Sequence, residues 1–263
     1  MYFGMPTLIE THDLEECAVL CKELNLDFIE ISMSLPQYTL HSIDIAQANK
    51  IADQYGIFYT IHLDENVNFS DFNTYIADAS KRYISNTIAL CKQLHISTVN
   101  MHFHRGEHFT LPDRKVDLYA VYNDHYLKSI YSFRDMCERA IGTDDIKICI
   151  ENCNGYPDFQ KQGLDILLDS SVFGLTFDVG HNHGCNGMDE PYILQNEKHL
   201  HHMHLHDAIG KKNHLSLGSG ELDVRKYLAL AQKRNCTVVL ETKTIAGLKK
   251  SVAWLTDSAG RAL

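Results

Sequence analysis

The sequence lacks the features that mark membrane-bound, exported or multidomain proteins. It has no run of about 18 apolar residues, no signal-peptide pattern and no Pro-rich or low-complexity linker, and only 5 of its 263 residues are proline. We therefore expect a cytoplasmic protein with no membrane partner. The length and the missing linker predict a single domain over residues 1–263.

Positive charge is also scarce. The chain has 24 Lys and Arg against 34 Asp and Glu, which gives a net charge of −10 at pH 7. Proteins that bind a phosphate backbone gain most of their affinity from Lys and Arg contacts. Nucleic acid is therefore a disfavoured partner.

The eight cysteines include no CxxC pair. Cys17, Cys21, Cys91 and Cys137 fall within segments of helical period. This placement favours buried, reduced thiols over a disulfide framework.

Short apolar runs that resemble strands alternate with longer segments of helical period along the whole chain. This order predicts parallel strands, in a closed barrel or an open doubly wound sheet. No GxGxxG motif follows the first run, which disfavours the dinucleotide-binding open sheet. We therefore predict an α/β fold, a (β/α)8 TIM barrel of about 250 residues. Its eight strands are expected at residues 2–5, 28–33, 57–63, 98–103, 146–151, 174–179, 200–206 and 237–241.

Capping residues set the expected helix boundaries. Asp13 and Glu16 have the spacing of a capping box. Ser42 is expected to start a helix that stops at Gly56, and Asp223 to precede a helix over 224–234.

Histidine is unusually abundant, with 16 residues, and it recurs with carboxylates where the expected strands end. In a parallel barrel these ends converge on one face, where active sites lie. Chance supplies one or two such residues, but it rarely supplies them on six strands in succession. The strand ends offer His62, His102, His104, Glu151, Asp178, His181, His204, His206 and Glu241.

Glu151 and Glu241 each end an apolar strand, where a buried carboxylate is costly unless it is paired or bound to a cation. Salt bridges are the alternative, but no nearby strand end presents enough Lys or Arg to neutralise every carboxylate. We therefore expect a divalent metal. A mixed set of imidazole and carboxylate ligands suits zinc, manganese, iron or cobalt better than calcium or magnesium, and we expect zinc or manganese.

Strand geometry limits which histidines reach one ion. His202, His204 and His206 alternate with apolar residues and project to the same side of their strand. At most one or two of them can contact a common ion, so His202 and His206 either hydrogen-bond to ligands or lie at the surface.

Three segments together resemble the xylose isomerase-like TIM barrel superfamily, which contains sugar isomerases, sugar epimerases and the endonuclease IV enzymes. They are Ile150-Glu151-Asn152, Phe177-Asp178-Val179-Gly180-His181, and the histidine-rich strand followed by Leu217-Gly218-Ser219-Gly220. The resemblance covers nearly the whole chain. The run from His214 to Gly220, taken alone, is either a phosphate-binding loop or a plain turn.

The resemblance implies a metal site formed by Glu151, Asp178, His204 and Glu241. It also matches His62, His102, His181 and His214 to further ligands of members that hold two or three metals.

Two positions depart from the pattern or leave it open. Multi-metal members carry an Asp two residues before the position of His214, where this chain has Lys212, which argues against a third metal. On the fourth strand both His102 and His104 match the family's histidine, and we favour His102 from its distance along the strand.

These observations predict an isomerase or epimerase that acts on a small sugar or a related hydroxy-carbonyl compound. A metal would hold adjacent oxygens of the substrate and acidify the intervening C–H. Glu151 and Glu241 would act as base and acid through an enediolate. His181 and Lys212 are the candidate substrate contacts, although loop lysines are by default solvated.

Two alternatives remain at this point. An endonuclease IV-like hydrolase acting on abasic DNA would use the extra histidines to cluster metals, but Lys212 and the acidic net charge argue against it. A barrel that only binds a ligand is the other alternative, because a fold does not establish an activity. A homo-oligomer is compatible with the sequence, but no feature requires one.

Overall fold

A computed structural model of the chain describes residues 1–259. Eight parallel strands form a closed barrel in the order β1-β12-β9-β8-β7-β4-β3-β2. Each expected strand is present, with bounds that differ by at most one residue at either end. They are β1 (Tyr2–Pro6), β2 (Phe28–Ser32), β3 (Phe58–His62), β4 (Thr98–His102), β7 (Lys147–Glu151), β8 (Phe173–Asp178), β9 (Leu200–Leu205) and β12 (Thr237–Leu240).

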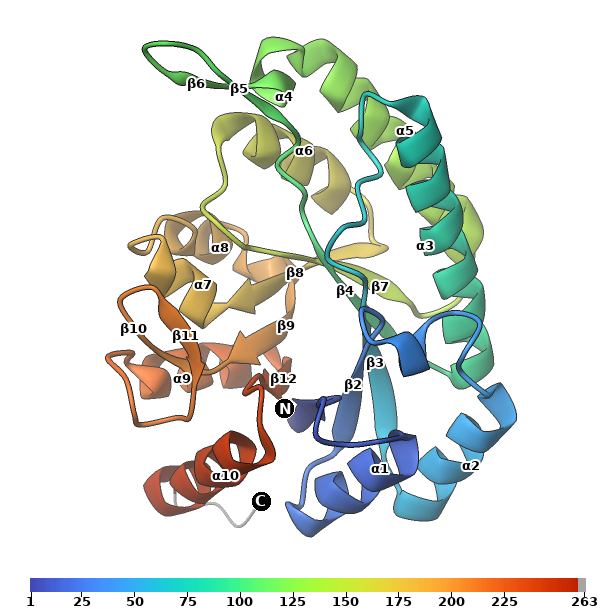
Figure 1. The fold of residues 1–263 in the computed structure, drawn as a ribbon, viewed down its shortest axis with the longest axis vertical. Coiled ribbons are helices and arrows are strands. Elements are labelled where there is room, and N and C mark those ends of the chain that lie inside the picture. The colour runs from blue at the N-terminus through green and yellow to red at the C-terminus, as the bar shows by residue number, and fades with distance from the viewer. Residues whose placement is uncertain (260–263) are drawn as a thin grey trace.

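Helices cover the outside of the barrel (Figure 1). Their apolar stripes pack on the outward faces of strands whose other faces fill the barrel, so most strand residues are buried. The helices are α1 (Leu14–Glu23), α2 (Ile45–Tyr55), α3 (Thr74–Leu94), α4 (Leu118–Val121), α5 (Asn123–Ile141), α6 (Asp158–Leu168), α7 (Val179–Gly184), α8 (Glu190–Gln195), α9 (Val224–Arg234) and α10 (Ile245–Ala259). None of the helices described is long and apolar enough to cross a membrane.

The expected caps are largely confirmed. The Asp13 carboxylate accepts a hydrogen bond from the Glu16 N–H at 2.9 Å, and Asp223 caps α9 in the same way. Gly56 ends α2 with φ = 59°, a conformation that glycine adopts without strain. The expected start of α2 at Ser42 is wrong by two residues, because Asp44 is the residue that caps its first turn.

Two short hairpins interrupt the βα order in the loops that follow β4 and β9. One pairs β5 (His108–Thr110) with β6 (Lys115–Asp117) and projects beside α4 (Figure 1). The other pairs β10 (Asp207–Ile209) with β11 (Lys212–Leu215). The periodicity of the sequence does not identify either hairpin, because strands of three or four residues carry too little pattern.

The prediction of buried, reduced thiols is confirmed for six of the eight cysteines, whereas Cys153 and Cys185 are only partly buried. All eight thiols are free, and those of Cys17, Cys21, Cys91, Cys137, Cys149 and Cys236 are buried.

Substituting Asp13 with alanine should lower the free energy of unfolding by about 1 kcal/mol, because the first turn of α1 loses its side-chain cap. Urea denaturation measures the change. Asp53→Ala is the control, since Asp53 is exposed within α2, and it should change stability by less than about 0.5 kcal/mol. Equal losses in the two variants would contradict the capping role.

Candidate metal centre

Strand register brings the expected ligands to one end of the barrel. His102 on β4 lies beside Glu151 on β7, and Asp178 on β8 lies beside His204 on β9. Glu241 directly follows β12, the strand that closes the barrel. Residues distant in sequence therefore meet at the carboxyl ends of parallel strands, where barrel active sites form.

One imidazole nitrogen and three carboxylate oxygens lie close together at these strand ends. The Nδ1 atom of His204 lies 3.5 Å from Glu151 Oε1, 3.8 Å from Asp178 Oδ2 and 3.4 Å from Glu241 Oε2. Three of the four, Glu151 Oε1, His204 Nδ1 and Glu241 Oε2, are buried without a hydrogen-bond partner. A tetrahedral zinc ion with bonds of 2.0–2.2 Å separates its ligands by roughly 3.3–3.6 Å. The donor set and its spacing therefore fit a divalent metal.

The second oxygen of Glu151 faces a different group of side chains. Its Oε2 accepts a hydrogen bond from Asn100 Nδ2 at 2.5 Å and lies 3.4 Å from both His62 Nε2 and His102 Nε2. Nδ1 of His62 is 2.8 Å from the Leu63 carbonyl, to which it can only donate. In a neutral ring Nε2 then presents a lone pair to the carboxylate, and only a proton or a cation between them makes this contact favourable.

The buried carboxylates shift the pKa values of the histidines around them. Burial would lower the pKa of His62, but Glu151 raises it to about 9. Burial likewise opposes the charged form of His181, whereas Asp178 and Glu151 raise its pKa to about 10. Burial would raise the pKa of Glu151, but His204 and other imidazoles hold it well below its usual value. The site thus attracts positive charge, supplied by protons or by metal.

Asp178 is oriented by the start of α7 and by His206. Its Oδ1 caps α7 by accepting from the His181 N–H at 2.6 Å, which leaves Oδ2 facing His204. The His214 N–H donates to His206 Nδ1 at 2.9 Å. In the neutral ring the hydrogen is therefore on His206 Nε2, which lies 3.2 Å from both oxygens of Asp178.

Lysine 243 is a site residue that sequence reasoning missed. Its Nζ donates to Glu241 Oε1 at 2.7 Å. Burial would raise the pKa of Glu241, but His204, Lys243 and His214 together hold it well below its usual value. The signal was present in the sequence, because Lys243 lies two residues after the carboxylate that ends β12.

Lys212, in contrast, is exposed on β11. The cation that the structure places at the carboxylate cluster is Lys243, so the support for Lys212 as a substrate contact is weaker than the sequence suggested. His181 is at the cluster, with Nδ1 3.3 Å from Glu151 Oε1 and 3.5 Å from Asp178 Oδ2.

The other uncertain histidines are now placed. His202 and His206 are both buried, so the interpretation that they lie at the surface is wrong. His102, and not His104, contacts Glu151. His104 Nδ1 instead accepts a hydrogen bond from the Gly106 N–H at 3.0 Å.

The glycine-containing loop after β11 is built around a carboxylate and not around a bound anion. Asp207 is buried and accepts hydrogen bonds from the N–H groups of Ala208, Gly220 and Leu222. A Cβ at Gly220 would lie 2.3 Å from Asp207 Oδ1, so a side chain is excluded there. This geometry supports the plain-turn interpretation of the segment.

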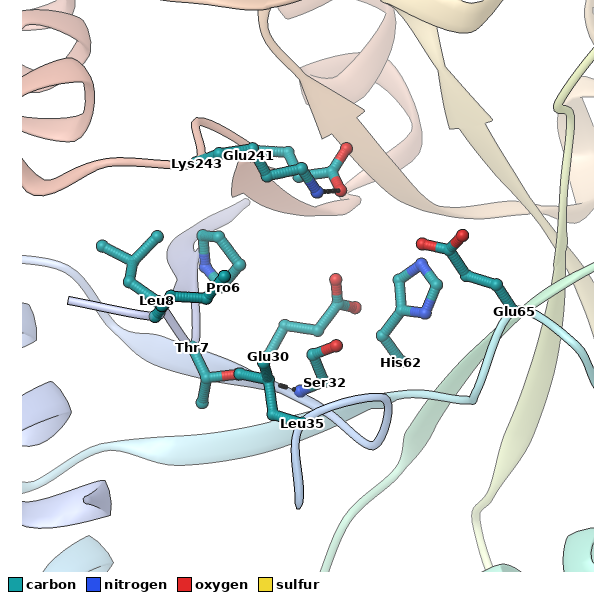
Figure 2. A pocket seen from close by; sticks show the side chains of 11 residues that line it. Pro6, Thr7, Leu8, Glu30, Ser32, Leu35, His62, Glu65, Glu241 and Lys243 are labelled. Carbon is teal, nitrogen blue, oxygen red and sulfur yellow. Dashed lines mark hydrogen bonds and ion pairs between the residues drawn. The ribbon is translucent and has the colours of Figure 1, made fainter. Parts of the chain in front are cut away.

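Two cavities flank the cluster. Figure 2 shows Glu30, His62, Glu65 and the Glu241–Lys243 pair facing one of them, which has a volume of about 240 Å3. The other, of about 330 Å3, lies on the side of His102 and reaches the base of the β5–β6 hairpin at His108. Glu65 lines both, so the two cavities share an edge beside the cluster.

Comparison with known sequences identifies the family. A profile described as "Xylose isomerase-like TIM barrel" matches residues 18–258. The chain belongs to this family. A search of curated protein sequences finds no significant match.

Solved structures of the same fold include several named as epimerases. A D-tagatose 3-epimerase-like protein superimposes with a TM-score of 0.80 at 20% identity, covering 99% of this chain and 97% of that one. The 3-keto-D-glucoside 4-epimerase YcjR of E. coli gives 0.77 at 17% identity, covering 98% and 99%. An IolI protein described with a bound zinc atom gives 0.76 at 14% identity, covering 100% of both chains. At these identities the likeness establishes the fold.

Substituting Gly180 with alanine should disturb the support of Asp178. A Cβ there would lie 1.9 Å from the ring of His206, so the ring must shift or the helix must move, at a cost of about 1–3 kcal/mol in unfolding free energy. Urea denaturation measures the loss. Gly184→Ala in the same helix is the matched control, because nothing lies within 4 Å of its added Cβ; a similar loss in both variants would contradict the argument.

Proposed function

We propose that the protein is a divalent-metal-dependent isomerase or epimerase acting on a sugar or a related hydroxy-carbonyl compound. The observation that carries the proposal is the set of buried, unpartnered atoms on Glu151, His204 and Glu241. The two carboxylate oxygens lie 3.5 Å and 3.4 Å from His204 Nδ1, and Asp178 Oδ2 lies 3.8 Å from it. The family membership and the epimerases of the same fold support this choice of reaction.

Bound in this site, a divalent metal would polarise a carbonyl and acidify the neighbouring C–H. The chain's own contribution is a pair of carboxylates that each direct only one oxygen at the metal position. The other oxygen, Oε2 in Glu151 and Oε1 in Glu241, faces hydrogen-bond donors instead. These two oxygens are the ones we assign to proton removal and return.

The two carboxylates have different surroundings, which suits different roles in one proton transfer. Glu151 Oε2 has Asn100, His62 and His102 around it, whereas Glu241 Oε1 has the ammonium of Lys243. Both carboxylates are ionised near neutral pH, because their pKa values lie well below the usual value. Either can therefore remove a proton, and the carboxylate that returns a proton to the substrate must first take one up from solvent.

Substrate size and chemistry follow from the cavities. A cavity of about 240 Å3 beside Glu241 and one of about 330 Å3 beside His102 provide room for a small polyhydroxy molecule on both sides of the cluster. Glu65, His62 and Lys243 supply hydrogen-bonding groups of the kind that fix sugar hydroxyls. We propose zinc or manganese as the metal, since both accept mixed imidazole and carboxylate ligands.

Metal content tests the site directly. Protein purified without chelator and incubated with zinc or manganese should hold at least one ion per chain by elemental analysis. Glu241→Gln should lose that ion, because it removes one anionic ligand. Glu221→Gln should keep it, since that carboxylate is 53% exposed and pairs with His183. A wild-type protein that takes up no metal would contradict the proposal.

Isotope exchange tests the chemistry. In D2O, the metal-loaded protein should introduce deuterium at the carbon beside the carbonyl of a ketose substrate, detected by NMR or mass spectrometry. Glu151→Gln and Glu241→Gln should each lower exchange by at least 100-fold, whereas Glu221→Gln should retain it. Exchange that survives in both cluster variants would rule out these carboxylates as the proton carriers.

A second candidate is metal-assisted hydrolysis of a phosphodiester. It is favoured by His62 and His102, which together with Glu151 Oε2 could hold another ion. Two or three ions per chain together with cleavage of abasic-site DNA would replace the isomerase proposal. The net charge of −10 ranks this candidate second.

A further inference from the structure

A carboxylate outside the proposed ligand set is buried below it in the barrel. Glu30 lies in the middle of β2, is 1% exposed, and directs its two oxygens to two different histidines of β9. Its Oε2 lies 2.9 Å from His202 Nε2 and its Oε1 lies 2.9 Å from His204 Nε2. The second contact is a close ion pair and not a hydrogen bond, because its angle is unfavourable and His204 Nε2 has no hydrogen-bond partner.

Neighbouring strands hold Glu30 in place. Thr60, its register partner on β3, donates to Glu30 Oε2 at 3.3 Å. His202 is fixed in turn, because its Nδ1 lies 2.6 Å from the hydroxyl of Thr237, its register partner on β12. Thr60 and His202 therefore both hold Oε2 of Glu30. This restricts the movement of the carboxylate, including Oε1, which lies beside His204.

The opposite edge of the His204 ring faces the proposed metal position through Nδ1. A neutral imidazole carries one hydrogen, so the two edges of the ring compete for it. With the hydrogen on Nε2, the N–H lies beside the Glu30 carboxylate and the Nδ1 lone pair remains for a metal. With the hydrogen on Nδ1, the lone pair of Nε2 would face the lone pairs of Glu30 Oε1, which is repulsive. Nδ1 would then have no lone pair with which to bind a metal.

We propose that Glu30 is a positioning residue that fixes the tautomer and orientation of His204 and thereby sets the metal affinity of the site. The inference rests on the metal site of the proposed function. Glu30 does so without being a ligand itself, because its two oxygens are both occupied by histidines. Carboxylates that hold ligating histidines in this way change metal affinity by about 10–100-fold in other sites.

The test is a zinc titration against a chelator of known affinity, using the full-length protein. Glu30→Gln should weaken zinc binding by about 10–100-fold while the stoichiometry stays the same. Glu30→Asp keeps the charge and should recover part of the affinity. Asp189→Asn is the matched control: Asp189 is also buried, but it accepts from the Gly155 and Tyr156 N–H groups, and its loss should leave zinc affinity unchanged.

Two further measurements separate positioning from a general loss of structure. Nitrogen-15 NMR of the imidazoles should show His204 bound through Nδ1 with a hydrogen on Nε2 in the zinc-loaded wild type. In cobalt-loaded protein, Glu30→Gln should shift the visible absorption bands and Asp189→Asn should not. Unchanged affinity and spectrum in folded Glu30→Gln would overturn the proposal, as would loss of a whole ion, which would make Glu30 a ligand.

The outcomes also distinguish this inference from the proposed function. A wild-type protein that binds no zinc overturns both. A wild-type protein that binds zinc and exchanges substrate deuterium, with Glu30→Gln indistinguishable from it, overturns only the role of Glu30.

Discussion

The structure depends on four carboxylates, Glu30, Glu151, Asp178 and Glu241, that are buried together inside the barrel. Burying one unpaired charge costs several kcal/mol, and the cost falls only when opposite charge and hydrogen bonds are supplied in the same place. The interior supplies imidazoles on nearly every side and the ammonium of Lys243 beside Glu241. A barrel that devotes this much of its interior to ionisable groups sacrifices apolar packing, which is a common cost of a functional site.

Each side chain of the proposed metal site is also held by a second group. One of its polar atoms faces the proposed metal position, and its other polar atom contacts a neighbouring residue. Asn100 holds Glu151, the first turn of α7 holds Asp178, Lys243 holds Glu241, and Glu30 contacts His204. Preorganisation of this kind matters because a ligand that must be reoriented on binding loses affinity.

Much of the fold could be predicted because most barrel strands are short apolar runs between segments of helical period, and these signals are local in the sequence. The ends of the strands were equally informative, since parallel strands bring their carboxyl ends together. The parts that could not be predicted depend on three-dimensional neighbours. Glu30 lies within an apolar strand and not at its end, and only the register of β2 and β9 shows that two histidines surround it. Lys212 was suggested by its place in a loop beside the predicted site, whereas the distance from Lys243 to Glu241 is a property of the folded chain.

The cluster draws on strands from β3 to β12, so its members are separated by almost 180 residues of chain. Glu241 joins them from the strand that pairs with β1 and closes the barrel. During synthesis, a ribosome must release nearly the entire chain before the last carboxylate can reach its place. An unfinished chain therefore presents only scattered histidines and acids, and the carboxylate cluster exists only in the completed barrel.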